Sequence, residues 1–128
     1  MGNRAVITTE EEKIGVYLHW NGGRDSVEGF LAVCEELGHR QPEKDHYGWA
    51  RLCQVIGNYF EGTASIGIDT LDKLDCDNGD NGMYIIKDWK IIGRKFFDNR
   101  KEQKEYKIEE MIQDIKDAQP KPKPKLKE

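Results

Sequence analysis

The segment from His19 to Ser26 holds residue types that could bind an anion. It reads His19-Trp20-Asn21-Gly22-Gly23-Arg24-Asp25-Ser26 and lies between an expected strand and an expected helix. A helix that begins after two glycines presents free backbone N–H groups at the positive end of its dipole, which suits a phosphate or a carboxylate. Arg24 would add a bidentate cation, Trp20 could stack on a base, and His19 could donate to the same ligand.

The same segment also has an ordinary structural interpretation. Asn-Gly-Gly forms turns, Ser26 is a common helix cap, and Trp20 is a common core anchor. The Gly-Lys-Ser/Thr end of a P-loop and the dinucleotide-binding glycine pattern are both missing. A plain turn therefore stands beside the hypothesis of a ligand site, whose residues would be His19, Trp20, Asn21, Gly22, Gly23, Arg24 and Ser26.

A second group of aromatic and basic residues opens the next expected helix. Its sequence is His46-Tyr47-Gly48-Trp49-Ala50-Arg51. Trp49 fits the apolar face of that helix, whereas His46, Tyr47 and Arg51 fit its outer face. Aromatic and arginine side chains are common at binding hot spots, so these three form a possible recognition patch. The alternative is core packing with a solvated outer face.

Catalytic and metal-binding patterns are weak in this sequence. His19, His39 and His46 have no HxxxH spacing, and no GxSxG or zinc pattern occurs. The acidic loop Asp75–Gly82 partly fits a calcium loop, but Gly79 occupies the third ligand position and the flanks favour strands. A hairpin turn at Asn78-Gly79 is the alternative. We predict no catalytic residue, no cofactor and no metal.

The three cysteines form no CxxC pair and no even disulfide set. Cys34 and Cys53 fall on apolar helix faces, where a thiol behaves as a small hydrophobic group. Cys76 lies between Asp75 and Asp77, which should raise the pKa of its thiol and slow its reactions.

The charge distribution limits the classes of partner. The formal net charge is −4, and residues 119–128 carry +3, which leaves −7 on residues 1–118. An acidic body argues against direct binding of duplex nucleic acid, whose affinity comes mostly from cations that face the phosphates. No run approaches the roughly 20 apolar residues that span a bilayer, so we expect no membrane association and a cytoplasmic location. The sequence leaves the oligomeric state open.

Hydrophobic periodicity predicts an α+β fold in the order ββααβββα. The expected strands cover residues 4–9, 14–20, 64–70, 83–87 and 90–97. The expected helices begin at an Asp25 or Ser26 cap, at an Asp45 cap, and near residue 102. Because hairpins dominate this order, we expect a mostly antiparallel sheet with the helices packed on one face.

The length and the end of the sequence predict one domain with a tail. A chain of 128 residues suits a single core, which we assign to residues 1–118. Residues 119–128 alternate proline with lysine, a composition typical of a disordered polyproline-II extension.

Three segments carry a resemblance to a group of proteins. They are Gly2-Asn3-Arg4-Ala5-Val6-Ile7-Thr8, Tyr17-Leu18-His19-Trp20-Asn21-Gly22-Gly23 and Tyr47-Gly48-Trp49-Ala50-Arg51. Over most of residues 2–97 the chain resembles small uncharacterised proteins of bacterial phages, prophages and other mobile elements. That group has no assigned activity, so the resemblance transfers no functional residue. It implies a bacterial host and an accessory role against host defence.

These observations favour a non-enzymatic binding protein that captures a small phosphate-bearing ligand, such as a signalling nucleotide. One alternative is a protein that inhibits a host defence effector through its acidic surface, in the manner of anti-CRISPR proteins. The other is a small hydrolase, which would need a histidine or carboxylate pair on the wall of a pocket.

Overall fold

The computed structural model describes residues 3–61, 65–103 and 106–121. These residues form a single α+β domain with one five-stranded sheet and three α-helices, which confirms the predicted fold class. In chain order the elements are β1 (Ala5–Thr9), β2 (Ile14–Leu18), α1 (Arg24–Glu36), α2 (His46–Tyr59), β3 (Ile66–Thr70), the 3-10 turn η1 (Leu71–Lys73), β4 (Met83–Lys87), β5 (Lys90–Lys95), the 3-10 turn η2 (Asn99–Lys101) and α3 (Ile108–Ala118).

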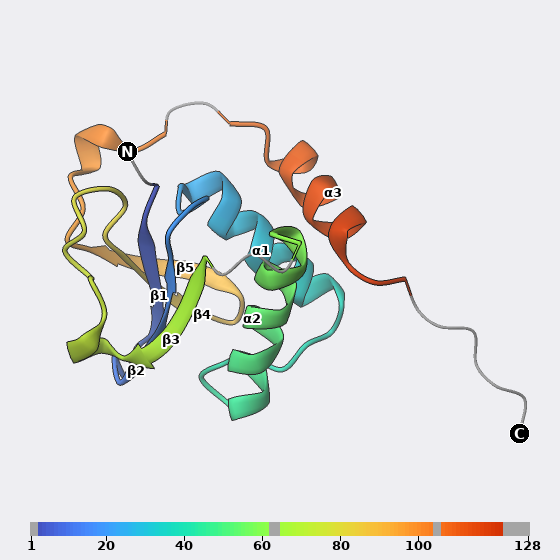
Figure 1. The fold of residues 1–128 in the computed structure, drawn as a ribbon, viewed down its shortest axis with the longest axis horizontal. Coiled ribbons are helices and arrows are strands. Elements are labelled where there is room, and N and C mark those ends of the chain that lie inside the picture. Colours follow the sequence, from blue (N-terminus) through green and yellow to red (C-terminus); the bar gives the residue numbers. More distant parts are fainter. Residues whose placement is uncertain (1–2, 62–64, 104–105, 122–128) are drawn as a thin grey trace, which may run out of the picture.

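The sheet has the strand order β3-β2-β1-β4-β5 (Figure 1). Three neighbouring pairs are antiparallel, whereas β1 and β4 run parallel, with Ile7 opposite Tyr84. β3 and β4 follow each other in the chain but are separated in the sheet by β2 and β1. Residues 71–82 therefore cross the sheet. The expectation that the Asp75–Gly82 loop closes a hairpin is wrong, because β4 pairs with β1 instead of β3.

The two faces of the sheet are covered by different parts of the chain. On the helix side, Ile7 of β1 and Val16 of β2 are fully buried in the main core. On the outer side, Val6 is fully buried beneath the crossing loop. Leu71 packs closely there, since a Cβ placed on Gly15 would lie only 2.8 Å from its Cδ2 atom. β1 is thus buried on both faces, as expected of a central strand.

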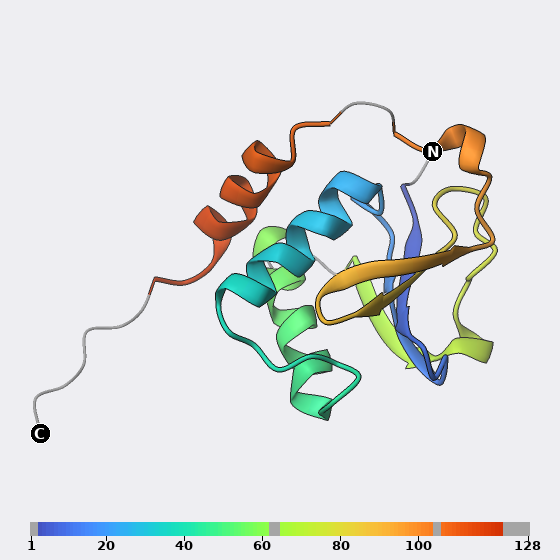
Figure 2. The ribbon, with the colours of Figure 1, turned by 180° about the vertical axis from the view of Figure 1, so that it is seen from behind.

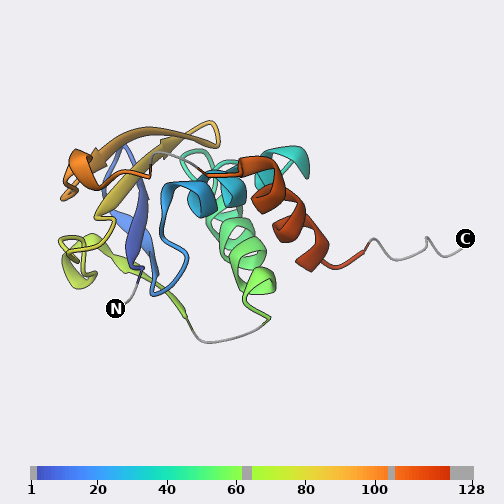
Figure 3. The same cartoon turned by 90° about the horizontal axis from the view of Figure 1, so that it is seen from above.

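The helices form two layers on one face of the sheet, as Figure 3 shows from above. α1 and α2 pack on the sheet, and the β4–β5 hairpin also contacts α1 (Figure 2). α3 lies outside them and packs mainly on α1 and α2, where its Ile115 is fully buried. Gly29 of α1 makes this approach possible, because a Cβ there would meet Ile115 at 2.7 Å.

Most helix ends follow local sequence signals. Asp45 caps α2 as predicted, and its carboxylate accepts a hydrogen bond from the Tyr47 N–H at 3.0 Å. Gly38 follows α1 with φ +75°, the left-handed conformation that ends many helices. The start of α1 differs from expectation. Its N-cap is Gly23, so Asp25 and Ser26 lie in the first turn.

α3 begins at Ile108, six residues after the predicted start. Glu102 and Gln103 have a high helix propensity, but their side chains bond to Arg94 and to the Asp25 N–H, which holds this segment in an extended path. At the other end, Gln119 donates to the Val55 carbonyl at 3.0 Å. Ordered contacts therefore reach into the segment predicted as a tail.

Three sequence-based assignments fall on segments that are not described. Residues 122–128 of the predicted Lys/Pro tail, residue 64 at the start of a predicted strand, and residues 104–105 of the helix expected from residue 102 lie outside the described residues.

Candidate functional site

The two glycines of the predicted anion site are buried against the protein itself. Gly22 donates to the Asn3 carbonyl at 2.8 Å and accepts from the Tyr84 hydroxyl at 2.7 Å. A Cβ on Gly22 would meet the Asn3 oxygen at 2.5 Å, so glycine is needed there for close packing. On Gly23, a Cβ would contact the amide oxygen of Gln103 at 3.1 Å.

Protein groups also occupy two N–H donors in the first turn of α1. The Asp25 N–H donates to Gln103 Oε1 at 3.0 Å. The Ser26 N–H donates to Asp25 Oδ1 at 2.7 Å. A phosphate at this helix end would have to replace both of these contacts.

Arg24 is part of a charged network at the same helix end. Its Nε lies 2.9 Å from Glu28 Oε1, and its Nη1 lies 3.5 Å from Glu102 Oε2. Arg94 binds the same Glu102 oxygen at 2.6 Å. Tyr106 completes the cluster by donating to Glu28 Oε2 at 2.6 Å. Arg24 thus has two carboxylate partners within the chain.

The remaining residues of the predicted anion site point in different directions. His19 and Trp20 are exposed at the end of β2, where their rings meet edge to face with centroids 4.9 Å apart. Trp20 is 46% exposed, so it is not a core anchor. Ser26 is buried, and its hydroxyl lies 3.8 Å from the Met111 sulfur of α3. Asn21 links the two parts through a 3.3 Å bond from its Nδ2 to the Ser26 hydroxyl.

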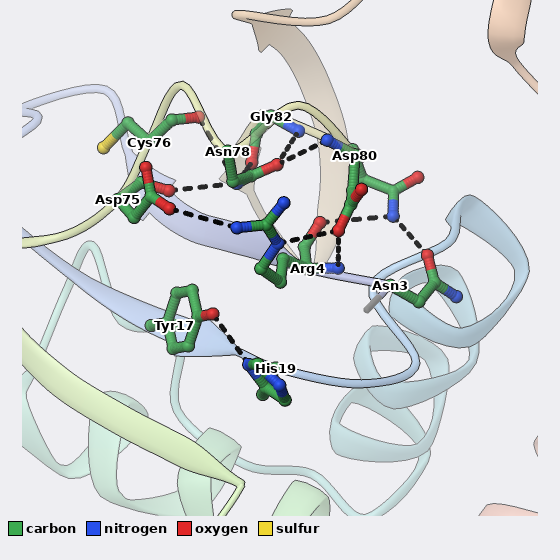
Figure 4. A network of polar contacts seen from close by, with 10 residues as sticks. Asn3, Arg4, Tyr17, His19, Asp75, Cys76, Asn78, Asp80 and Gly82 are labelled. Carbon is green, nitrogen blue, oxygen red and sulfur yellow. Dashed lines mark hydrogen bonds and ion pairs between the residues drawn. The ribbon is translucent and has the colours of Figure 1, made fainter. Parts of the chain in front are cut away.

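The loop considered for calcium binding folds around Arg4 instead (Figure 4). Arg4 Nε lies 2.8 Å from Asp80 Oδ2, and its Nη1 lies 3.5 Å from Asp75. Asn78 is buried and bonds to the Asp75 and Gly82 carbonyls, which fixes the shape of the loop. Among the described residues, no group of three or more His, Cys, Asp or Glu side chains could hold a metal ion.

A pocket forms where the predicted recognition patch meets the end of α1. It has a volume of about 370 Å³ and is lined by Gly38, His39, Arg40, Tyr47 and Arg51. We call it the Tyr47 pocket. Tyr47 is 50% exposed, and the Arg40 guanidinium carbon lies 5.3 Å from the centroid of its ring. The His46 ring stacks on Tyr47, with centroids 4.7 Å apart and an interplanar angle of 28°.

The Tyr47 pocket is locally basic in an acidic protein. The pocket holds the guanidinium groups of Arg40 and Arg51. The Asp45 carboxylate neutralises that of Arg40, whose Nη1 lies 2.8 Å from Asp45 Oδ2. Arg51 bonds only to the Gln54 side chain at 3.4 Å, and no carboxylate pairs with it in the part of the chain that the structure describes. Partial burial and the nearby Arg51 lower the pKa of His39, so its imidazole is neutral at pH 7.

The structure adds His39 and Arg40 to the residues that the sequence indicated. Both lie in the loop between the helices, which reads as an ordinary polar connection. The sequence offers one indication that Arg40 lies near the start of α2, because it precedes the Asp45 cap by only five residues. In the structure the two side chains form an ion pair.

The three histidines show no assembled catalytic pair. His19 Nδ1 lies 3.0 Å from the Tyr17 hydroxyl on the outer face of the sheet (Figure 4). His46 Nδ1 lies 3.5 Å from Asp45 Oδ1, and that carboxylate already caps α2 and binds Arg40. The small-hydrolase hypothesis therefore gains no support from the arrangement of these residues.

No helix within the described residues has the length and apolar character needed to cross a bilayer. Comparison with known proteins finds no matching family, no matching curated protein and no matching solved structure.

Proposed function

We propose that this chain is a non-enzymatic binding protein that captures a small phosphate-bearing aromatic molecule, of the class of a nucleotide, in the Tyr47 pocket. The observation that carries the proposal is the placement of Arg40 and Arg51 in one pocket with the exposed ring of Tyr47. Arginine recognises phosphate through paired N–H donors, and a tyrosine ring offers a stacking surface to any base.

The two chemical parts of such a ligand have separate partners. Arg51 lacks a carboxylate partner among the described residues, so its guanidinium is available to a phosphate. His46 stacks on Tyr47 and its side chain is 87% exposed, so a base can extend this stack. The neutral His39 adds a hydrogen-bonding group without adding charge.

This proposal moves the anion site from the start of α1 to the start of α2. The chemistry expected from the sequence is unchanged, but Arg24 has two carboxylate partners whereas Arg51 has none in the described residues. For a protein of a mobile element in a bacterial cytoplasm, the captured molecule would be a nucleotide signal of host defence.

Isothermal titration with ATP, adenosine and inorganic triphosphate tests the proposal. We expect ATP to bind, and Arg51→Ala to weaken that binding by about tenfold or more, because a charge-assisted contact is lost. Tyr47→Ala should weaken the binding of ATP but leave the binding of triphosphate unchanged. Arg100→Ala, which removes an arginine whose side chain is 90% exposed, is the matched control.

Two results would contradict this site. One is an ATP affinity that Arg51→Ala and Tyr47→Ala leave unchanged. The other is loss of binding in Arg24→Ala with no change in melting temperature, which would return the site to the start of α1. We expect Arg24→Ala instead to lower the melting temperature, because it leaves Glu28 and Glu102 with fewer partners.

A further inference from the structure

The crossing loop leaves an apolar groove on the outer face of the sheet. The groove has a volume of about 510 Å³ and is lined by Glu12, Leu71, Asp72, Leu74, Asp75, Cys76, Asp77, Met83 and Phe96. We call it the outer groove. It lies on the face of the sheet opposite the helices, so it is separate from the Tyr47 pocket.

The apolar lining of the outer groove comes from the loop and the two strands beside it. Met83 is fully buried, while Leu71 and Leu74 are half-buried. Phe96 is 54% exposed at the end of β5. An apolar centre of this kind, surrounded by polar groups, is the usual layout of a protein interface.

The backbone of Phe96 has an unusual conformation. Its φ is +57°, in the left-handed region that bulky residues rarely adopt. The backbone of Phe96 also lies close to Gly82, because a Cβ on Gly82 would meet the Phe96 oxygen at 2.4 Å. The chain adopts this conformation at a position where it exposes a large apolar ring beside the outer groove.

The rim of the outer groove is acidic. Of its four carboxylates, Glu12 pairs with Lys95 at 2.8 Å and Asp75 pairs with Arg4 at 3.5 Å. Asp72 and Asp77 have no ion pair in the part of the chain that the structure describes. The net charge of −7 on residues 1–118 adds to the negative potential of this rim.

We propose that the outer groove docks a basic peptide segment of a partner protein, with an apolar side chain in the groove and lysine or arginine on either side. The apolar anchor would lie between Leu74 and Phe96, and the flanking cations would meet Asp72 and Asp77. Charge complementarity selects this occupant, since an acidic or neutral segment would leave the unpaired carboxylates without partners. The inference is independent of the ligand in the Tyr47 pocket.

Fluorescence anisotropy with the labelled peptide Lys-Lys-Leu-Leu-Lys-Lys tests the docking. We expect saturable binding that weakens as salt increases, because the rim charges are exposed and screened. Replacing both leucines of the peptide by serine, or its lysines by glutamate, should abolish binding. Absence of saturable binding at low salt would overturn the proposal, as would equal binding of the serine peptide.

Two variants separate docking from stability. Phe96→Asn removes the apolar ring and places a residue that tolerates positive φ, so the variant should fold at least as well and bind the peptide at least tenfold more weakly. Asp72→Asn with Asp77→Asn should reduce both the affinity and its salt dependence. Leu37→Gln, at a 52% exposed leucine on the helix side, is the control that should bind normally.

Cys76 reports directly on the occupancy of the outer groove. Partial burial and the carboxylates of Asp75 and Glu12 raise the pKa of its thiol, so alkylation by N-ethylmaleimide is slow and is followed at mildly alkaline pH. Bound peptide should slow alkylation of Cys76 further and leave Cys53 of α2 unchanged. Peptide binding without protection of Cys76 would place the peptide elsewhere and refute the proposal.

Discussion

Gly48→Ala is expected to destabilise the protein by about 2 kcal/mol or more, because the added methyl group would overpack a contact with neighbouring backbone atoms. Backbone atoms have little room to move away. Gly48 is buried in the first turn of α2. A Cβ there would meet the Gln41 carbonyl carbon at 2.3 Å and the Pro42 nitrogen at 2.5 Å. Urea denaturation followed by circular dichroism measures the change in the free energy of unfolding.

Gly57→Ala in the same helix is the matched control. A Cβ at this position has no heavy atom within 4 Å. Alanine stabilises a helix interior by about 0.5–1 kcal/mol relative to glycine, so this variant should be more stable than the parent. Opposite signs for two identical substitutions in one helix would confirm the packing at Gln41 and Pro42. The same sign for both would show that the loop before α2 is packed differently.

Arg94→Ala is the second substitution with a large expected effect. The guanidinium carbon lies 3.9 Å from the Tyr84 ring centroid and 3.7 Å from that of Phe97. Its Nη1 binds Glu102 at 2.6 Å and its Nη2 donates to the Asn81 carbonyl at 2.8 Å, while the side chain is only 9% exposed. Alanine removes the stacking on both rings and the charged hydrogen bond to Glu102, which is 28% exposed and keeps Arg24 as a partner, so the free energy of unfolding should fall by about 2 kcal/mol or more.

Two further variants identify which property of Arg94 matters. Arg94→Lys keeps the charge but loses the planar stacking and the second donor, so its free energy of unfolding should fall between those of the parent and the alanine variant. Arg100→Ala removes an exposed arginine and should leave the urea midpoint unchanged. An Arg94→Ala variant as stable as the parent would mean that Arg94 does not hold residues 97–103 against the sheet.

The sequence predicts the elements well where one local signal dominates. The β-branched and aromatic residues of 4–9 and 14–20 identify two strands, and the Asp45 cap identifies the start of α2. The start of α3 is mispredicted because Glu102 gains more from Arg94 than from a helical turn. Helix propensities amount to tenths of a kcal/mol per residue, less than one charged hydrogen bond.

The strand pairing could not be predicted from local chemistry. Asn78-Gly79 favours a turn whether that turn closes a hairpin or crosses a sheet. Which of the two forms depends on whether β4 pairs with β1, which lies more than 70 residues earlier in the chain. No local sequence pattern indicates that contact.

The sequence singled out two of the residues that line the Tyr47 pocket. The Tyr47 and Arg51 spacing indicates one exposed helix face, and that face does line the pocket. The sequence could not show that Arg24 is already paired with Glu102, 78 residues away. Its pairing with Glu28 was readable, because residues four apart on a helix lie side by side.

The parallel contact between β1 and β4 has a consequence for synthesis on the ribosome. β1 is made first, yet its second hydrogen-bonding edge stays open until Met83–Lys87 emerges. At about 5–20 residues per second, the nascent chain exposes that edge for several seconds. An unpaired strand edge readily recruits other chains, so co-expression of a chaperone that binds nascent chains should increase the soluble yield.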